Sequence, residues 1–157
     1  GKGFLAVMLA KMLGPSPGLE VGSAIAVLVG HNWSVFIRFQ GGKGTATGIG
    51  ALSAMSPLSG LIVISVGLPF IAIFRYVSLG SIVGAITSLV SIVLLASLAP
   101  SNSLGAPSYI YILYPAIGMP ILLFKHRENI TRLLKGQERK LGESVIVADT
   151  YPKFQGQ

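Results

Sequence analysis

Charged side chains are scarce in this chain of 157 residues, and acidic ones are the scarcest. Only 11% of the residues are charged, 52% are apolar, and five Asp and Glu accompany twelve Lys and Arg. Two long stretches, residues 44–74 and 76–124, contain no charged residue. A soluble domain of this length does not show such a composition, whereas helices that span hydrocarbon require it. The sequence therefore predicts a membrane protein.

Cysteine is absent and histidine occurs twice. The lack of thiols excludes a disulfide framework, a thiolate nucleophile and a zinc–thiolate site, and we expect neither a metal nor a cofactor. The N-terminus has no initiator Met, and the charged region, short apolar run and cleavage site of a secretory signal do not follow it. We therefore expect a fragment of a longer protein.

The apolar runs, broken at proline, glycine and charge, divide the chain into six predicted helical spans. They cover residues 3–13, 19–36, 45–56, 58–74, 77–98 and 109–124. The third is short, because it would measure only about 18 Å as a helix against a hydrocarbon core of about 30 Å. The predicted fold class is all-α, a polytopic membrane bundle of about six spans. It forms one domain over residues 1–142, followed by a tail at 143–157.

The distribution of basic residues favours a crossing by every segment, the short one included. If all six cross, Lys11 is the only one of the twelve Lys and Arg that does not fall on one common face. The positive-inside rule makes that common face cytoplasmic. The same count of six crossings places three segments on this face: the turn at Lys43, the turn at Ser78 and the residues after His126. We expect them to share one pocket.

A lysine flanked by glycines lies just before the third segment, where residues 41–44 read Gly-Gly-Lys-Gly. Glycines leave backbone N–H groups accessible, and a helix beginning at Thr45 would add its N-terminus, so this turn is suited to bind an anion such as phosphate. It is not a Walker A loop, because Ile37 stands where that motif needs its first glycine. The plainer interpretation is that Gly44 and Gly48 pack helices together and that Lys43 only marks the cytoplasmic side.

Polar side chains in the other predicted cytoplasmic turns are candidates for the same site. His126 lies in a polar run with Asn129, and histidine can act as an acid, a base or a charged phosphate ligand near neutral pH. Ser78 and Ser81 either donate to a substrate or bond back to their own helix, which is the commoner role of serine in helices. His31 lies inside an apolar segment and is interpreted as a hydrogen-bonding residue of helix packing.

After His126 the chain has leucines at helical spacing with interleaved cations, a pattern typical of a short helix on anionic head groups. A basic patch beside a last membrane span indicates lipid contact, so we expect membrane lipids and no nucleic acid as partners. The uncharged connection at residues 99–108 is rich in turn formers, and we assign it no chemistry.

Several polar blocks follow one another in the order found in a known enzyme family. They are residues 30–33, 39–47, 75–81, 126–130 and 138–142. The second reads Phe-Gln-Gly-Gly-Lys-Gly-Thr-Ala-Thr, and the fourth reads His-Arg-Glu-Asn-Ile. With these motifs across nearly its whole length, the chain closely resembles the bacterial acyl-phosphate:glycerol-3-phosphate acyltransferases, the PlsY family. That family has seven spans, so we expect its first helix and first motif loop to be missing before Gly1.

The resemblance implies an integral enzyme of the bacterial inner membrane that acts in phospholipid biosynthesis. It would transfer a fatty acyl group from acyl phosphate to the 1-hydroxyl of glycerol 3-phosphate, giving lysophosphatidic acid and phosphate, and we expect a monomer with its site and basic tail on the cytoplasmic face. The implied phosphate-binding residues are Gly41, Gly42, Lys43, Gly44, Thr47 and Arg127. The implied catalytic residues are Lys43, Ser78, Ser81, His126 and Asn129.

Acyl phosphate is a mixed anhydride, so orientation of the hydroxyl and stabilisation of charge can supply most of the catalysis without a covalent intermediate. Either His126 or a substrate phosphate is the base. A His-x-x-x-x-Asp acyltransferase motif is excluded, because Phe36 and Thr131 stand five residues after the two histidines. The alternative is a non-catalytic transporter or phosphate-lipid-binding protein. The charge-free stretches offer no ionisable path through the bilayer, which favours a one-sided site.

Overall fold

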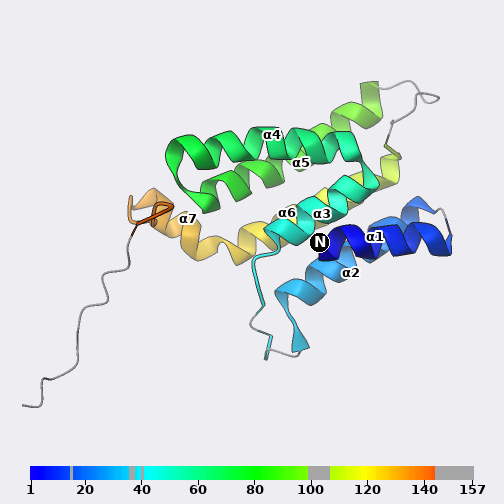
Figure 1. The fold of residues 1–157 in the computed structure, drawn as a ribbon, viewed down its shortest axis with the longest axis horizontal. Coiled ribbons are helices and arrows are strands. Elements are labelled where there is room, and N and C mark those ends of the chain that lie inside the picture. Colours follow the sequence, from blue (N-terminus) through cyan, green and yellow to red (C-terminus); the bar gives the residue numbers. More distant parts are fainter. Residues whose placement is uncertain (15, 36–37, 40, 99–106, 144–157) are drawn as a thin grey trace, which may run out of the picture.

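The computed structural model describes residues 1–14, 16–35, 38–39, 41–98 and 107–143, and among these it contains helices and no strand. The elements are packed side by side as an elongated bundle (Figure 1). In chain order they are α1 (Lys2–Leu13), α2 (Pro17–Asn32), α3 (Thr45–Met55), α4 (Pro57–Phe74), α5 (Val77–Leu98), the 3₁₀ turn η2 (Tyr109–Ile112), α6 (Leu113–Lys125) and α7 (Arg127–Leu134).

Each of the six predicted spans is a helix, so the predicted all-α membrane bundle is confirmed. Two helices in the described part of the chain, α4 and α5, are long and apolar enough to cross a bilayer on length and composition. The continuous unit formed by η2 and α6, Tyr109–Lys125, is apolar but shorter. The short third span is an α-helix of 11 residues, α3, packed between α1 and α4. The connection predicted at residues 99–108 falls mostly outside the described residues.

One predicted helix end differs from the structure, and the end of the tail helix, for which no bound was predicted, also has a local cause. The helix predicted to reach residue 36 ends at Asn32, because Trp33 leaves the helical region with φ of −129° and ψ of 59°. The predicted tail helix begins at Arg127 and ends at Leu134. Gly136, which follows, adopts a φ of 66°, a left-handed conformation in which glycine commonly stops a helix.

Proline and serine set the sharp turn between α3 and α4. A single residue, Ser56, separates the two helices and accepts a hydrogen bond from the backbone N–H of Ser59 at 3.4 Å. Pro57 occupies the first position of α4, where its missing N–H costs no hydrogen bond. Farther along the pair of long helices, Gly80 of α5 packs against Ile71 of α4 so closely that no side chain would fit. This contact agrees with the predicted packing role of small residues.

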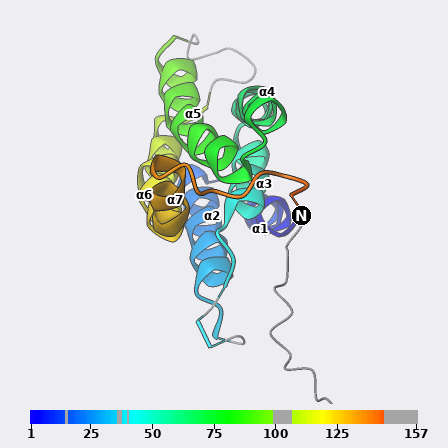
Figure 2. The same ribbon diagram turned by 90° about the vertical axis from the view of Figure 1, so that its left-hand side faces the viewer.

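The bundle has two polar ends with different compositions. In Figure 1 the α4–α5 turn and α7 lie at one end, and the α1–α2 connection lies at the other. After α7 the chain crosses the first of these ends in front of α5 (Figure 2). There the backbone N–H of Leu141 donates to the carbonyl of Arg75 at 2.6 Å, and Arg75 Nη2 donates to the carbonyl of Leu141 at 2.6 Å. We call this the tail-crossed end.

A polar cluster of Lys11, Glu20 and Tyr111 closes the opposite end, and its carboxylate and hydroxyl groups belong to buried residues. Glu20, at the start of α2, is only 5% exposed and accepts a hydrogen bond from the Tyr111 hydroxyl at 2.6 Å. Lys11 Nζ lies 3.5 Å from the same carboxylate and donates to the carbonyl of Ala54 at 2.6 Å. These contacts join α1, α2, α3 and η2. The one basic residue predicted on this side is therefore paired rather than free.

We predict that Tyr111→Phe destabilises the bundle by about 1–3 kcal/mol, because it leaves a buried carboxyl group short of a hydrogen bond. The matched control is Tyr109→Phe, the same chemical change at a side chain that is largely exposed. Thermal unfolding of the purified protein in one detergent compares the three proteins. Equal melting temperatures for Tyr111→Phe and the unmodified protein would show that the cluster does not hold this end together.

Candidate active site

The glycine–lysine loop lies on the C-terminal end of α2. Gly41 packs against the backbone of His31 and Asn32, and Gly42 packs against the His31 imidazole. Gly41 has no room for a side chain against this backbone, and a side chain at Gly42 would meet the His31 ring, so the two glycines let the loop approach the helix end. Gly44 caps α3 with φ of 79° and ψ of −4°, a conformation that glycine adopts without strain. The His31 ring thus contacts the loop rather than another helix, and the hydrogen-bonding role predicted for it stays a prediction.

This arrangement presents a row of backbone N–H groups at the N-terminus of α3. Among the described residues, the backbone N–H groups of residues 43–47 donate no hydrogen bond, and the first bond of this turn runs from Gly48 to the carbonyl of Gly44 at 2.7 Å. The unpaired N–H groups and the partial positive charge of a helix N-terminus together favour a bound anion. The helix start predicted at Thr45 is therefore confirmed, and anion binding by residues 41–44 stays a prediction.

Side chains from all three predicted cytoplasmic turns meet at the tail-crossed end. Lys43 Nζ donates to Asn129 Oδ1 at 2.6 Å, and Asn129 Nδ2 donates to Glu138 Oε1 at 2.6 Å. The same carboxylate oxygen accepts a hydrogen bond from Ser78 Oγ at 2.7 Å. Arg132 Nε completes the group by donating to Glu138 Oε2 at 2.8 Å. The loop, the α4–α5 turn and α7 thus contribute to one polar network, as predicted.

Sequence reasoning missed two residues of this network, Arg132 and Glu138, and Glu138 is the one that contacts most of its members. It belongs to the last of the motif blocks, but nothing in its spacing shows that the chain folds back across the bundle. Its side chain is 8% exposed. Burial alone raises its pKa, yet hydrogen bonds from Asn129, Ser78 and Arg132, with the charge of Arg132, outweigh this and lower the pKa below its ordinary value. Glu138 therefore stays ionised and orients the Asn129 amide so that its oxygen faces Lys43.

His126 is placed at the junction of α6 and α7 and is 2% exposed. Its Nδ1 lies 2.9 Å from the carbonyl oxygen of Leu122, which can only accept, so the neutral ring carries its proton on Nδ1. The lone pair is then on Nε2. Burial lowers the pKa of His126, and the charge of Lys43 acts in the same direction. A neutral imidazole with its lone pair on Nε2 is the form that a general base requires.

The remaining predicted site residues lie outside this network. Ser81 donates to the carbonyl of Val77 at 2.9 Å, the back-bonding alternative that the sequence left open. Thr47 is buried in the first turn of α3, with its carbonyl against Gly3 of α1. Arg127 is exposed, stacks on the Phe124 ring at 4.7 Å and donates to the Phe124 carbonyl at 3.2 Å. Their roles with substrate stay predictions.

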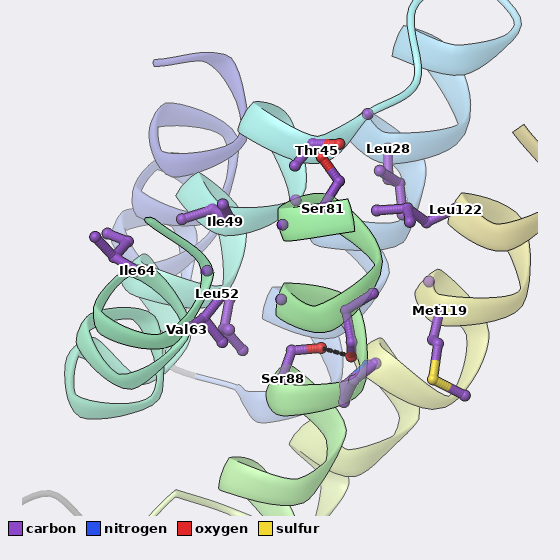
Figure 3. A pocket seen from close by; sticks show the side chains of 18 of the residues that line it. Leu28, Thr45, Ile49, Leu52, Val63, Ile64, Ser81, Ser88, Met119 and Leu122 are labelled. Atoms are coloured by element: carbon purple, nitrogen blue, oxygen red, sulfur yellow. Dashed lines mark hydrogen bonds between the residues drawn. The ribbon is translucent and has the colours of Figure 1, made fainter. Parts of the chain in front are cut away.

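An apolar cavity of about 120 Å³ begins beside the loop and runs between α3, α4, α5 and α6. Thr45 and Ser81 lie close together at one end of it, and Ser88 lies farther along α5 (Figure 3). Glycines of α3, α4, α5 and α6 contribute to the wall, and the lining is almost free of polar groups. A bundle of apolar helices with an anion-binding network at one end and an apolar cavity next to it defines a membrane protein suited to lipid-tailed phosphates.

Comparison with known proteins agrees with this class. The family model described as glycerol-3-phosphate acyltransferase matches residues 1–136. A glycerol-3-phosphate acyltransferase of Thermoanaerobacter sp. (strain X514) is 42% identical over 146 residues, which are 93% of this chain and 68% of the relative. One of Thermus thermophilus is 40% identical and is matched over 92% of this chain and 67% of its own length. The chain belongs to the glycerol-3-phosphate acyltransferase family, as its motifs predict.

Solved structures show the same fold. Crystal structures of PlsY (YgiH), an integral membrane glycerol 3-phosphate acyltransferase, match in a glycerol 3-phosphate form with a TM-score of 0.75 and in a lysophosphatidic acid form with a TM-score of 0.74, both at 33% identity. They cover 89% of this chain, which spans 66% and 67% of theirs. The chain is thus a multi-pass membrane protein that spans about two thirds of the length of its relatives.

We predict that His126 titrates below the ordinary histidine pKa of about 6.5. Histidine NMR follows the titration, and His31→Gln assigns the two signals. Lys43→Met removes a positive charge and should move the midpoint upward, whereas Glu138→Gln removes a negative charge and should lower it. Because the His126 pKa is lower in the folded state than in the unfolded state, protonation of His126 favours unfolding. The stability that neutral His126 contributes is therefore fully present above about pH 6.5 and is lost as the pH falls toward the folded-state pKa. A His126 titration midpoint above pH 6.5, or one that Lys43→Met does not move, contradicts the predicted lowering of the His126 pKa by burial and by Lys43.

Proposed function

We propose that this chain carries the acyl-transfer site of an enzyme that moves a fatty acyl group from acyl phosphate to the 1-hydroxyl of glycerol 3-phosphate. The observation that carries the proposal is the contact of Lys43 with Asn129, which joins the cation of the glycine loop to the polar network at α7. Two phosphate-bearing substrates need such donors. The crystal structures of PlsY, in glycerol 3-phosphate and lysophosphatidic acid forms, support the same substrate and product.

The apolar cavity is suited to the acyl chain of the donor. Its polar end is formed by Gly44, Thr45 and Ser81, next to the loop, so a fatty chain lying in the cavity would keep its acyl phosphate at the network. The carbonyl carbon would then face the 1-hydroxyl of a glycerol 3-phosphate held by the loop and Lys43. This juxtaposition of the two reactants is a large part of the catalysis that the reaction needs.

In the proposed step, the hydroxyl oxygen of glycerol 3-phosphate attacks the carbonyl carbon of acyl phosphate. An ester C–O bond forms, the C–O bond of the anhydride breaks, and inorganic phosphate leaves. The hydroxyl proton passes to His126 Nε2 or to the leaving phosphate. Lys43 and the N–H groups at the start of α3 stabilise the negative charge that develops on the phosphate oxygens. No covalent intermediate on the protein is required, and serine needs only to donate hydrogen bonds.

The alternative function, transport or non-catalytic binding of a phosphate lipid, has less support. The apolar cavity carries no charged group among its described lining residues, so it provides no ion path across the bundle. The proposed orientation places the tail-crossed end and residues 143–157 on the cytoplasmic side of the bacterial inner membrane. This follows from the excess of Lys and Arg at that end, and the enzyme is proposed to act as a monomer with membrane lipids around it.

Purified full-length protein, supplied with acyl phosphate and labelled glycerol 3-phosphate, should form labelled lysophosphatidic acid. Lys43→Met should reduce kcat/KM by about 10²–10³-fold, because a charge-assisted contact to the reacting phosphates is lost. Lys135→Met is the matched control, since it removes the same charge from an exposed position after α7 and should leave turnover unchanged. Absence of product from the unmodified protein, or full activity in Lys43→Met, would sink the proposal.

The absence of cysteine makes the proposed orientation easy to test. Single cysteines at Arg38 and Lys135 should react with a membrane-impermeant maleimide from the cytoplasmic side, and a cysteine at Ser16 should react from the opposite side. All three positions are exposed in the structure. Labelling of Arg38→Cys and Lys135→Cys from different sides would overturn the six-span arrangement, whereas labelling of both from outside would reverse only its orientation.

A further inference from the structure

A fully buried asparagine lies directly beneath the glycine–lysine loop. Asn32 is the last residue of α2 and is 0% exposed. Within the part of the chain that the structure describes, neither the amide nitrogen nor the amide oxygen of its side chain has a hydrogen-bond partner. A buried polar side chain without partners is costly and uncommon in native proteins. The network around Lys43 does not include Asn32, so its burial needs a separate explanation.

The contacts of Asn32 are with the loop on one side and α6 on the other. A methyl group added to Gly44 would lie 2.8 Å from Asn32 Oδ1 and 3.0 Å from Nδ2, so the side-chain amide faces the residue that caps α3. Gly41 packs against the backbone carbonyl of Asn32. That carbonyl also accepts a hydrogen bond from Lys125 Nζ at 2.9 Å. The side chain is therefore held in place while its own donor and acceptor stay unused.

The loop offers the complementary groups. The backbone N–H groups of residues 43–47 donate no hydrogen bond among the described residues, and the loop backbone packs on the end of α2 at Gly41. The Asn32 amide carries both a donor and an acceptor, which matches a backbone segment rather than a phosphate, since a phosphate chiefly accepts. Asn32 is also covered by the loop, so a substrate cannot reach it without displacing Gly44.

We propose that Asn32 is a positioning residue for phosphate binding: when the loop closes on a substrate phosphate, its backbone settles onto the Asn32 amide. Nδ2 then donates to a loop carbonyl and Oδ1 accepts from one loop N–H, which fixes the remaining N–H groups toward the phosphate. The inference rests on the proposed function, because it assumes that residues 41–47 hold a phosphate of the acyl-transfer substrates. It adds a buried group behind the loop that contacts no substrate atom.

Asn32→Leu tests this role, because leucine has a similar size and no polar atom. If Asn32 only filled space, removal of an unsatisfied amide would keep or raise the melting temperature and leave the kinetics unchanged. The proposal instead expects an equal or higher melting temperature together with a KM at least ten-fold higher for glycerol 3-phosphate or acyl phosphate. Asn32→Asp keeps the shape but adds a charge near the phosphate, and it should raise KM further.

The control is Ser91→Ala, which alters a buried polar residue of α5 that bonds to the Ser88 carbonyl at 3.1 Å and does not contact the loop. Its KM values should match those of the unmodified protein. Unmodified KM values in Asn32→Leu, with an active parent enzyme, overturn the inference alone. An inactive parent enzyme overturns the proposed function instead.

Amide hydrogen exchange keeps the test decisive if Asn32→Leu does not fold. In the unmodified protein, glycerol 3-phosphate or acyl phosphate should slow exchange at residues 41–47, and Asn32→Asp should remove most of that protection. Exchange at this segment that neither substrate slows, in a protein that turns both over, contradicts closure of the loop onto Asn32.

Discussion

The hydrogen bond from Lys43 to Asn129 is the contact on which the site depends. It joins residues 86 positions apart in the chain and ties the start of α3 to α7. At the edge of an apolar bundle an ammonium group without a partner is expensive, so the lysine is held where an acceptor is supplied. Asn129 supplies that acceptor only because Glu138 holds its NH₂ group. A neutral amide pairs with the lysine without neutralising it, and the positive charge therefore remains available to an anionic substrate.

The polar network and the apolar cavity together suit one kind of ligand. A lipid-tailed phosphate has an apolar chain and a charged head, and it can be bound only where both environments adjoin. A single helix contributes to both environments along its length, because α3 begins at the loop and continues as a wall of the cavity. In the same way, α5 carries Ser78 at the network and Ser88 deeper in the cavity. The opposite end, closed by Lys11, Glu20 and Tyr111, needs no such opening and holds the helices together.

Much of this could be predicted from the sequence because membrane helices leave strong local marks. Long uncharged stretches indicated the spans, and the distribution of basic residues predicted that Lys43, Ser78 and His126 lie at one end. What could not be predicted depends on the path of the chain outside the helices. Glu138 reaches the network only because Gly136 ends α7 and the chain turns back across α5. Asn32 lies within the predicted span of residues 19–36, so its role at a helix end was not predicted. Its position beneath Gly44 follows from where α2 stops.

The central claim is that residues 41–47 and Lys43 hold a substrate phosphate. Solid-state NMR dephasing between the ³¹P of bound glycerol 3-phosphate and ¹⁵N-labelled glycine amides and lysine side chains measures this contact in a lipid bilayer. The account predicts dephasing of a few glycine amides and of one lysine Nζ at hydrogen-bonding range, with the lysine effect lost in Lys43→Met. A bound, productive substrate whose phosphorus dephases neither glycine amides nor a lysine Nζ would contradict it.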